Sequence, residues 1–292
     1  MMARSTFEVA HAGGKATFAF PEFGRGSYVG IGKKMRAEGL EVPTGDIMAS
    51  LVEAAYIPDS KECGRDHFEP WDAARELHYK EFHRPDLERV RQIMEGFSCL
   101  YIFQRCLWTT HGVYVSQDLE AKGFSEPLVL SELERAISTG KKVAPGVIFS
   151  EDGKTRFACM GSYGTIGYHH FSSETQSYST KCHVVGDEEV VWGAPLTSED
   201  LAKDGLVIAS FGVEGAQKLS RVSSLFETYP RVFLDMAPLP GEPPVMTVEG
   251  IYRSNRISLS SGGTALHICT ALGRVTKDAG SAFAFGVLPA PS

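Results

Sequence analysis

The feature that most constrains the fold is that apolar residues follow a helical spacing in one part of the chain and a strand-like spacing in most others. Between residues 44 and 56 the apolar positions recur three and four apart, which places them on one face of a helix that Thr44 would cap. Further helices are predicted over residues 70–82 and from Pro85 onward, since proline suits the first turn of a helix. The predicted helices are therefore concentrated in the N-terminal half.

Strands are predicted in adjacent pairs, where two short apolar segments flank a turn. In the last of these pairs, Leu259 would face Leu266 and Ile257 would face Ile268 across a Gly-Gly turn. Strands that are adjacent in sequence pair in the antiparallel sense. The three predicted hairpins join residues 6–9 with 16–20, residues 147–149 with 156–159, and residues 257–261 with 264–268.

One segment predicts a parallel crossover instead. Residues 206–211 have the composition of a strand, residues 215–229 that of a helix and residues 231–235 that of a strand, which gives one βαβ-like unit near 206–235. The connecting loop has two glycines where a dinucleotide loop has three, and Glu214 would repel phosphates, so no nucleotide site is predicted. Residues 99–108 fit either a helix or a buried strand, because a continuous apolar run has no informative period.

These elements together predict an α+β fold with a mixed, mostly antiparallel sheet. A chain of 292 residues that is 43% hydrophobic is long enough to bury a substantial core. We expect a single globular unit over residues 1–292. Within it, residues 1–120 would form a helix-rich lobe and residues 140–292 a strand-rich lobe.

Charge and cysteine content argue against several classes of protein. The chain carries 29 Lys and Arg against 36 Asp and Glu, a net charge of −7, whereas binding to the nucleic-acid backbone needs a basic face. No stretch approaches the ~18 consecutive apolar residues of a membrane-spanning helix, and the N-terminus lacks the apolar region of a secretory signal. The six cysteines form no CxxC pair, which is typical of free thiols in a reducing compartment. We therefore expect a soluble, cytoplasmic protein without disulfides that binds neither nucleic acid nor membranes.

The segment from Cys159 to His183 has the highest density of reactive side chains, with two cysteines and three histidines. We predict a strand–loop–strand arrangement in which His169 faces Cys182 on one side of the pair. His170 and His183 would form the corresponding pair after a one-residue change of register. His169 and Cys182 are therefore the candidate base and nucleophile of a catalytic site.

The same segment contains a candidate zinc site. Cys159, His169 and Cys182 would supply the nitrogen and sulfur ligands that zinc prefers, and a catalytic zinc needs three such ligands with one open position. Because the spacing matches no established zinc pattern, we favour the absence of a cofactor over zinc. The simpler interpretation is a pair of polar, half-exposed strands with an ordinary buried thiol.

Two further segments carry weaker signals. Residues 63–83 mix cysteines, histidines and carboxylates, but His78 and Glu81 are the pair that would share a helix face, so a solvated helix surface explains the mixture better than a metal site. Residues 24–34 are rich in glycine and lysine but do not match the spacing of a phosphate-binding loop. We expect a loop between elements there.

The sequence contains no complete catalytic arrangement, so we favour a non-catalytic interaction or structural protein. The aromatic residues between 163 and 178 would then form its binding surface. The alternative is an enzyme, a hydrolase or transferase that acts on a small polar substrate through the His and Cys cluster at 159–183. Its partner in either case would be a small molecule or a protein. A concave cavity that holds the histidines would favour the enzyme, and a flat aromatic face would favour the binding protein.

Overall fold

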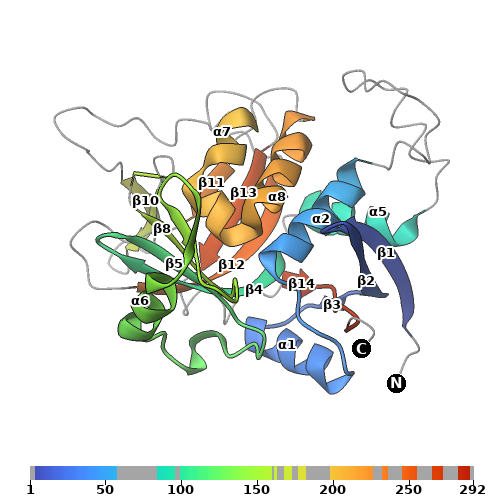
Figure 1. Ribbon diagram of the computed structural model, residues 1–292. Helices are drawn as coiled ribbons and strands as arrows, with labels where there is room; N and C mark the ends of the chain where they lie inside the picture. The colour runs from blue at the N-terminus through green and yellow to red at the C-terminus, as the bar shows by residue number, and fades with distance from the viewer. Residues whose placement is uncertain are drawn as a thin grey trace.

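A computed structural model of the chain describes the elements of the fold and their arrangement (Figure 1). The described residues are 4–57, 84–95, 99–159, 161–162, 168–172, 177–181, 198–225, 232–235, 245–254, 265–271 and 282–289.

A ten-stranded sheet forms the centre of the described structure. Its strands are β3 (Phe23–Gly24), β4 (Cys99–Thr109), β5 (Gly112–Gln117), β6 (Lys141–Ala144), β7 (Val147–Phe149), β8 (Thr155–Cys159), β11 (Val232–Asp235), β12 (Val245–Ser254), β13 (Ala265–Ala271) and β14 (Ala282–Ala284). They are ordered β11-β13-β12-β4-β5-β8-β7-β6, and β14 and β3 continue the sheet beside β4. Strands β11 and β13 pair in parallel, as do β14 and β4, and the other pairs are antiparallel. The predicted α+β fold with a mixed, mostly antiparallel sheet is therefore confirmed.

Strand β4 occupies the middle of the sheet because both of its faces are apolar. Leu100 and Ile102 belong to one core cluster, whereas Tyr101 and Phe103 belong to a second cluster on the opposite face. Since successive side chains of a strand point to opposite faces, a continuous apolar run is what a strand covered on both faces requires. The ambiguity over residues 99–108 is resolved in favour of a strand.

One face of the sheet is covered by four of the described helices and a hairpin (Figure 1). The elements on this face are β1 (Ser5–His11), β2 (Gly14–Phe20), α2 (Gly45–Tyr56), α5 (Pro85–Glu95), α7 (Ser198–Lys203) and α8 (Gly205–Ser224). The predicted apolar face of α2 is confirmed, because Met48, Leu51, Val52 and Ala55 are at most 1% exposed. Burial of a side chain of the size of Leu or Met contributes about 1.5–3 kcal/mol, so this face fixes α2 on the sheet.

The opposite face is covered by helices α1 (Tyr28–Ala37) and α6 (Leu130–Ser138) (Figure 1). Helix α1 corrects the predicted loop at residues 24–34. Ser27 caps this helix, since its hydroxyl accepts a hydrogen bond from the backbone N–H of Gly30 at 3.2 Å. Ile31 and Met35, one turn apart, are buried against β4 and β14. This burial outweighs the low helix propensity of the glycines, which the sequence had suggested would form a loop.

The predicted strand at residues 206–211 is wrong, because these residues form the first half of α8. The side chain of Asp204 starts the helix by accepting hydrogen bonds from the backbone N–H groups of Leu206 and Val207, each at 3.0 Å. Residues 206–211 are all buried, and their sequence is apolar except for Ser210, so it shows no helical period. The βαβ-like unit near 206–235 is therefore also wrong, although β11 does pair in parallel with β13.

A kink divides α8 at Gly212, where φ is 73° and ψ is 168°. This backbone conformation is essentially limited to glycine. The start of α2 lies directly against the kink: a Cβ atom at Gly45 would lie 1.9 Å from the carbonyl oxygen of Ser210. A Cβ atom at Gly212 would lie 2.8 Å from Oδ1 of Asp46. Both glycines are therefore needed for the close approach of the two helices.

Two of the predicted hairpins are confirmed and the third is wrong. Strands β1 and β2 pair as expected, and so do β7 and β8. In the third, however, Leu266 lies opposite Arg253 and Ile268 lies opposite Ile251. The partner strand is β12 rather than residues 257–261, and β12 also pairs with β4, so the register is fixed by the whole sheet rather than by the Gly-Gly turn. Residues 257–261, like the predicted helix at 70–82, lie outside the described residues.

The distribution of the helices agrees with the expected concentration in the N-terminal half, since four of the six described α-helices end before residue 140. None of the described helices is both long enough and apolar enough to cross a membrane. Among the described cysteines, Cys99, Cys106 and Cys159 are free thiols. The division into lobes over 1–120 and 140–292 stays a prediction.

Replacing Gly212 with alanine tests whether the kink is required. We expect Gly212→Ala to lower the free energy of unfolding by about 2 kcal/mol more than Gly39→Ala. Gly39 is a matched control, because its φ of 77° is similar but a Cβ atom there would meet nothing within 4 Å. Urea unfolding of the two variants measures the difference. Equal losses of stability would show that the contact between Gly212 and Asp46 is not constraining.

Candidate functional site

The structure places the predicted cysteine and histidine residues only in part. Cys159 ends β8 and is half-buried, and His169 lies in β9 (Tyr168–Ser172), which pairs with β10 (Ser177–Lys181). The predicted strand–loop–strand arrangement is confirmed, but the predicted pairing of His169 directly opposite Cys182 is wrong, because the register places Thr180 opposite His169. Cys182 lies outside the described residues. The catalytic pair of His169 and Cys182 and the zinc set that adds Cys159 therefore stay predictions.

Within the described segments, no three His, Cys, Asp or Glu side chains converge as the ligands of a metal would. The predicted cluster at residues 63–83 lies outside these segments. The polar groups that do converge come instead from α2, α8, β8 and the first hairpin.

The first polar cluster is an ion pair between Arg156 of β8 and Asp46 of α2. The guanidinium group donates two parallel hydrogen bonds, from Nη1 to Oδ1 at 2.8 Å and from Nη2 to Oδ2 at 2.5 Å. Nη1 also donates to the carbonyl oxygen of Ala209 at 3.2 Å, and Nε donates to that of Gly153 at 3.1 Å. The side chain of Arg156 is 7% exposed and that of Asp46 is 33% exposed. This pair joins the sheet to both helices.

The position of the pair follows from the kink in α8. Carbonyl groups in the last turn of a helical segment generally lack partners within the helix, and Arg156 donates to that of Ala209, just before Gly212. The carboxylate of Asp46 lies beside Gly212, where the second half of α8 begins and the helix dipole favours a negative charge. The cation therefore meets the end of one helical segment and the anion meets the start of the next.

The second polar cluster surrounds the hydroxyl group of Ser50, which is 1% exposed. Nζ of Lys218 donates to Ser50 Oγ at 2.9 Å, and Nδ1 of His11 lies 2.9 Å from the same oxygen. Ser50 Oγ donates its proton to the carbonyl oxygen of Asp46 at 3.2 Å. We therefore place a proton on Nδ1 of His11, so that the serine oxygen accepts hydrogen bonds from both Lys218 and His11. Lys218 is neutralised by Glu214 at 2.8 Å.

This cluster contains the residue types of a nucleophilic site, but its hydrogen bonds connect elements of the fold and leave no free reactive group. A serine within hydrogen-bond reach of a histidine and a lysine is the arrangement that activates a hydroxyl nucleophile. Here the single proton and both lone pairs of Ser50 are engaged, and its side chain is enclosed. A reacting carbon atom therefore has no free lone pair to approach. The cluster connects β1, α2 and α8.

The residues of both clusters were missed by the sequence analysis, although a signal exists. Ser50 lies between Ala49 and Leu51, and Lys218 precedes Leu219, in helices with many apolar residues, and both positions are buried in the structure. A polar residue at such a position needs a partner, because an unpaired buried polar group is destabilising. The identity of the partner depends on how α2 and α8 are placed side by side, which the sequence does not specify.

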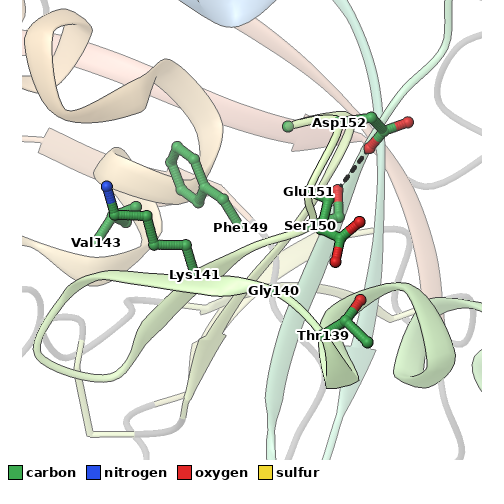
Figure 2. Close-up of a pocket in the computed structure, with 9 residues that line it drawn as sticks. Thr139, Gly140, Lys141, Val143, Phe149, Ser150, Glu151 and Asp152 are labelled. Atoms are coloured by element: carbon green, nitrogen blue, oxygen red, sulfur yellow. Dashed lines mark hydrogen bonds between the residues drawn. The ribbon is translucent and has the colours of Figure 1, made fainter.

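A pocket of about 400 Å³ lies at the end of the sheet formed by β6 and β7, strands that contact α8 (Figure 2). It is lined by residues 139–141, Val143 and residues 149–153. Phe149 and Val143 provide its apolar surface. Figure 2 shows the side chain of Lys141 on one side of Phe149 and those of Glu151 and Asp152 on the other. The pocket is largely open to solvent.

Strand β6 is the last strand at this end of the described sheet, and its open edge is protected against pairing with another chain. It is four residues long, and Lys141 and Lys142 are both exposed. A shift of register between Lys142 and Ala144 marks a bulge, and Pro145 follows the strand. Short length, lysine, a bulge and proline each hinder strand addition. A ligand is therefore expected to use the pocket rather than to extend the sheet.

Comparison with known proteins gives no relative: no protein-family model, no curated protein and no solved structure matches this chain.

The pH dependence of stability tests the assignment of His11. Burial, followed by the Lys218 ammonium group, lowers the pKa of His11 below its ordinary value of 6.5, while Asp46 and Glu214 act in the opposite direction. Below pH 6.5 the unfolded chain therefore binds a proton at His11 before the folded protein does, and acidification reduces the contribution of this residue to stability. We expect the stability of the wild type relative to His11→Gln to fall between pH 7.5 and pH 5. Urea unfolding at the two pH values measures this difference, and a constant or increasing difference would contradict the assignment.

Proposed function

We propose that the protein is a non-catalytic binding protein and that the pocket at the end of the sheet is its binding site. The observation that carries this proposal is the contrast between the pocket and the interior. In the interior, Arg156 and Lys218 are neutralised by Asp46 and Glu214 and hold the fold together. At the pocket, charged side chains are exposed around an apolar surface.

The charged residues of the pocket are available to a ligand. Lys141 and Glu151 are exposed, and neither forms a hydrogen bond or an ion pair with another described residue. The ring of Phe149 is held in place by Arg156, whose guanidinium group lies 4.5 Å from the centre of the ring. A rigid aromatic surface with a few polar groups around it is the usual composition of a small-molecule site.

The alternative of an enzyme that acts through His169 and Cys182 depends on the sequence alone. The Ser50 cluster does not add to it, because the hydroxyl group is fully engaged. We also propose a cytoplasmic location, which is supported by the free thiols of Cys99, Cys106 and Cys159.

The proposal is tested by screening a library of small polar fragments against the ¹⁵N-labelled protein by NMR. We expect fragments to shift the amide signals of Gly140 and Gly153, which line the pocket. Lys141→Ala should weaken the binding of anionic fragments about threefold, the size of an exposed ion pair.

Lys142→Ala is the matched control, because Lys142 is equally exposed but does not line the pocket. We expect it to leave fragment binding unchanged. Binding that maps to another surface, or equal effects of the two lysine substitutions, would contradict the proposed site.

A further inference from the structure

We infer that the pocket binds a small zwitterion with an apolar side chain, of the chemical class of the apolar amino acids. The inference rests on the proposed function, because it names the ligand class for the same pocket. Three parts of the lining support it: one cationic group, two anionic groups and the apolar surface between them.

The apolar surface provides the contact for the side chain of the ligand. Phe149 and Val143 are half-buried and pack against the main core, so each presents only part of its surface to the pocket. Arg156 stacks on the ring of Phe149 and limits its movement. An aliphatic or aromatic group that covers this surface gains the burial of apolar area without having to order the protein first.

The cationic side of the pocket is Lys141. Lys141 and Lys142 are successive residues of β6, so their side chains point to opposite faces of the sheet. Lys141 is the one that lines the pocket. In the described part of the chain its ammonium group has no carboxylate partner, so it can pair with the carboxylate of a ligand.

The anionic side consists of Glu151 and Asp152, in the turn that joins β7 to β8. Asp152 accepts hydrogen bonds from Ser150 Oγ at 2.7 Å and from the backbone N–H of Lys154 at 3.0 Å, and both reach Oδ1. The hydrogen bond from Ser150 is the main cause that lowers the pKa of Asp152, so the carboxyl group is ionised at neutral pH. Its second oxygen and the carboxylate of Glu151 are directed to solvent and can receive an ammonium group.

The separation of the two charges determines the selectivity. Figure 2 shows Lys141 and the two carboxylates on opposite sides of Phe149, so one ligand must carry both charges with its apolar group between or beside them. A ligand with a single charge leaves one side of the pocket without a partner. A second charge of the same sign would meet a like charge at the other side, which disfavours dications and dianions.

The test compares three probes that share one side chain and differ in their charged groups: L-phenylalanine, L-phenylalaninamide, which lacks the carboxylate, and N-acetyl-L-phenylalanine, which lacks the ammonium group. Their dissociation constants are measured by NMR titration with the wild type, Lys141→Ala and Glu151→Gln. Both substituted residues are exposed, so the fold is retained.

We expect the wild type to bind L-phenylalanine about threefold or more tightly than either derivative, as for loss of an exposed ion pair. Lys141→Ala should weaken L-phenylalanine and the acetyl derivative but not the amide. Glu151→Gln should weaken L-phenylalanine and the amide but not the acetyl derivative.

Equal affinity for the three probes, or failure of all three to bind, would overturn the ligand class. If small fragments still shift the signals of Gly140 and Gly153 in that case, the proposed binding site stands and only the assignment to zwitterions fails. If neither the probes nor the fragments reach the pocket, the proposed function fails as well.

Discussion

The ion pair between Arg156 and Asp46 is the interaction on which the arrangement of the helices over the sheet depends. It joins the start of β8, the first turn of α2 and the kink of α8, and it places its cation and its anion where two helical segments end and begin. Removal of one partner from a buried ion pair is destabilising by about 3–5 kcal/mol, because the other charge is left without compensation. The effect here should lie toward the lower end, since one third of the Asp46 side chain is exposed.

The same arginine connects the core to the pocket. Its guanidinium group stacks on the ring of Phe149. The residue that fixes the helices therefore also fixes the apolar surface to which a ligand would bind. The Ser50 cluster acts in a similar way one turn further along α2, where Lys218 and His11 attach α8 and the first hairpin. The interior charges of the described structure therefore hold elements together, whereas the exposed charges of Lys141, Glu151 and Asp152 surround a pocket. This division is the physical basis for interpreting the protein as a binding protein.

Much of the local structure could be predicted from the sequence, because periodicity and turn chemistry are local properties. Helix α2, the start of α5 and the hairpins β1–β2 and β7–β8 are examples. The prediction failed where burial removes the period, as at residues 206–211, and where a long strand fixes the register, as in β12. The polar clusters and the pocket could not be predicted, since Asp46 and Arg156 are separated by 110 positions in the chain and meet only when α2 and α8 are packed on the sheet. The pocket likewise depends on the relative placement of the turn at 149–153 and the edge strand.

The most direct test of this account is a double-mutant cycle on the central ion pair. The free energy of unfolding is measured for the wild type, Asp46→Asn, Arg156→Met and the double variant, with the ring of Phe149 monitored by NMR. The account predicts a coupling energy of about 2 kcal/mol or more between the two residues, together with a change in the environment of the Phe149 ring whenever Arg156 is replaced. A coupling energy below about 0.5 kcal/mol, or a Phe149 ring that is unaffected by Arg156→Met, would contradict it.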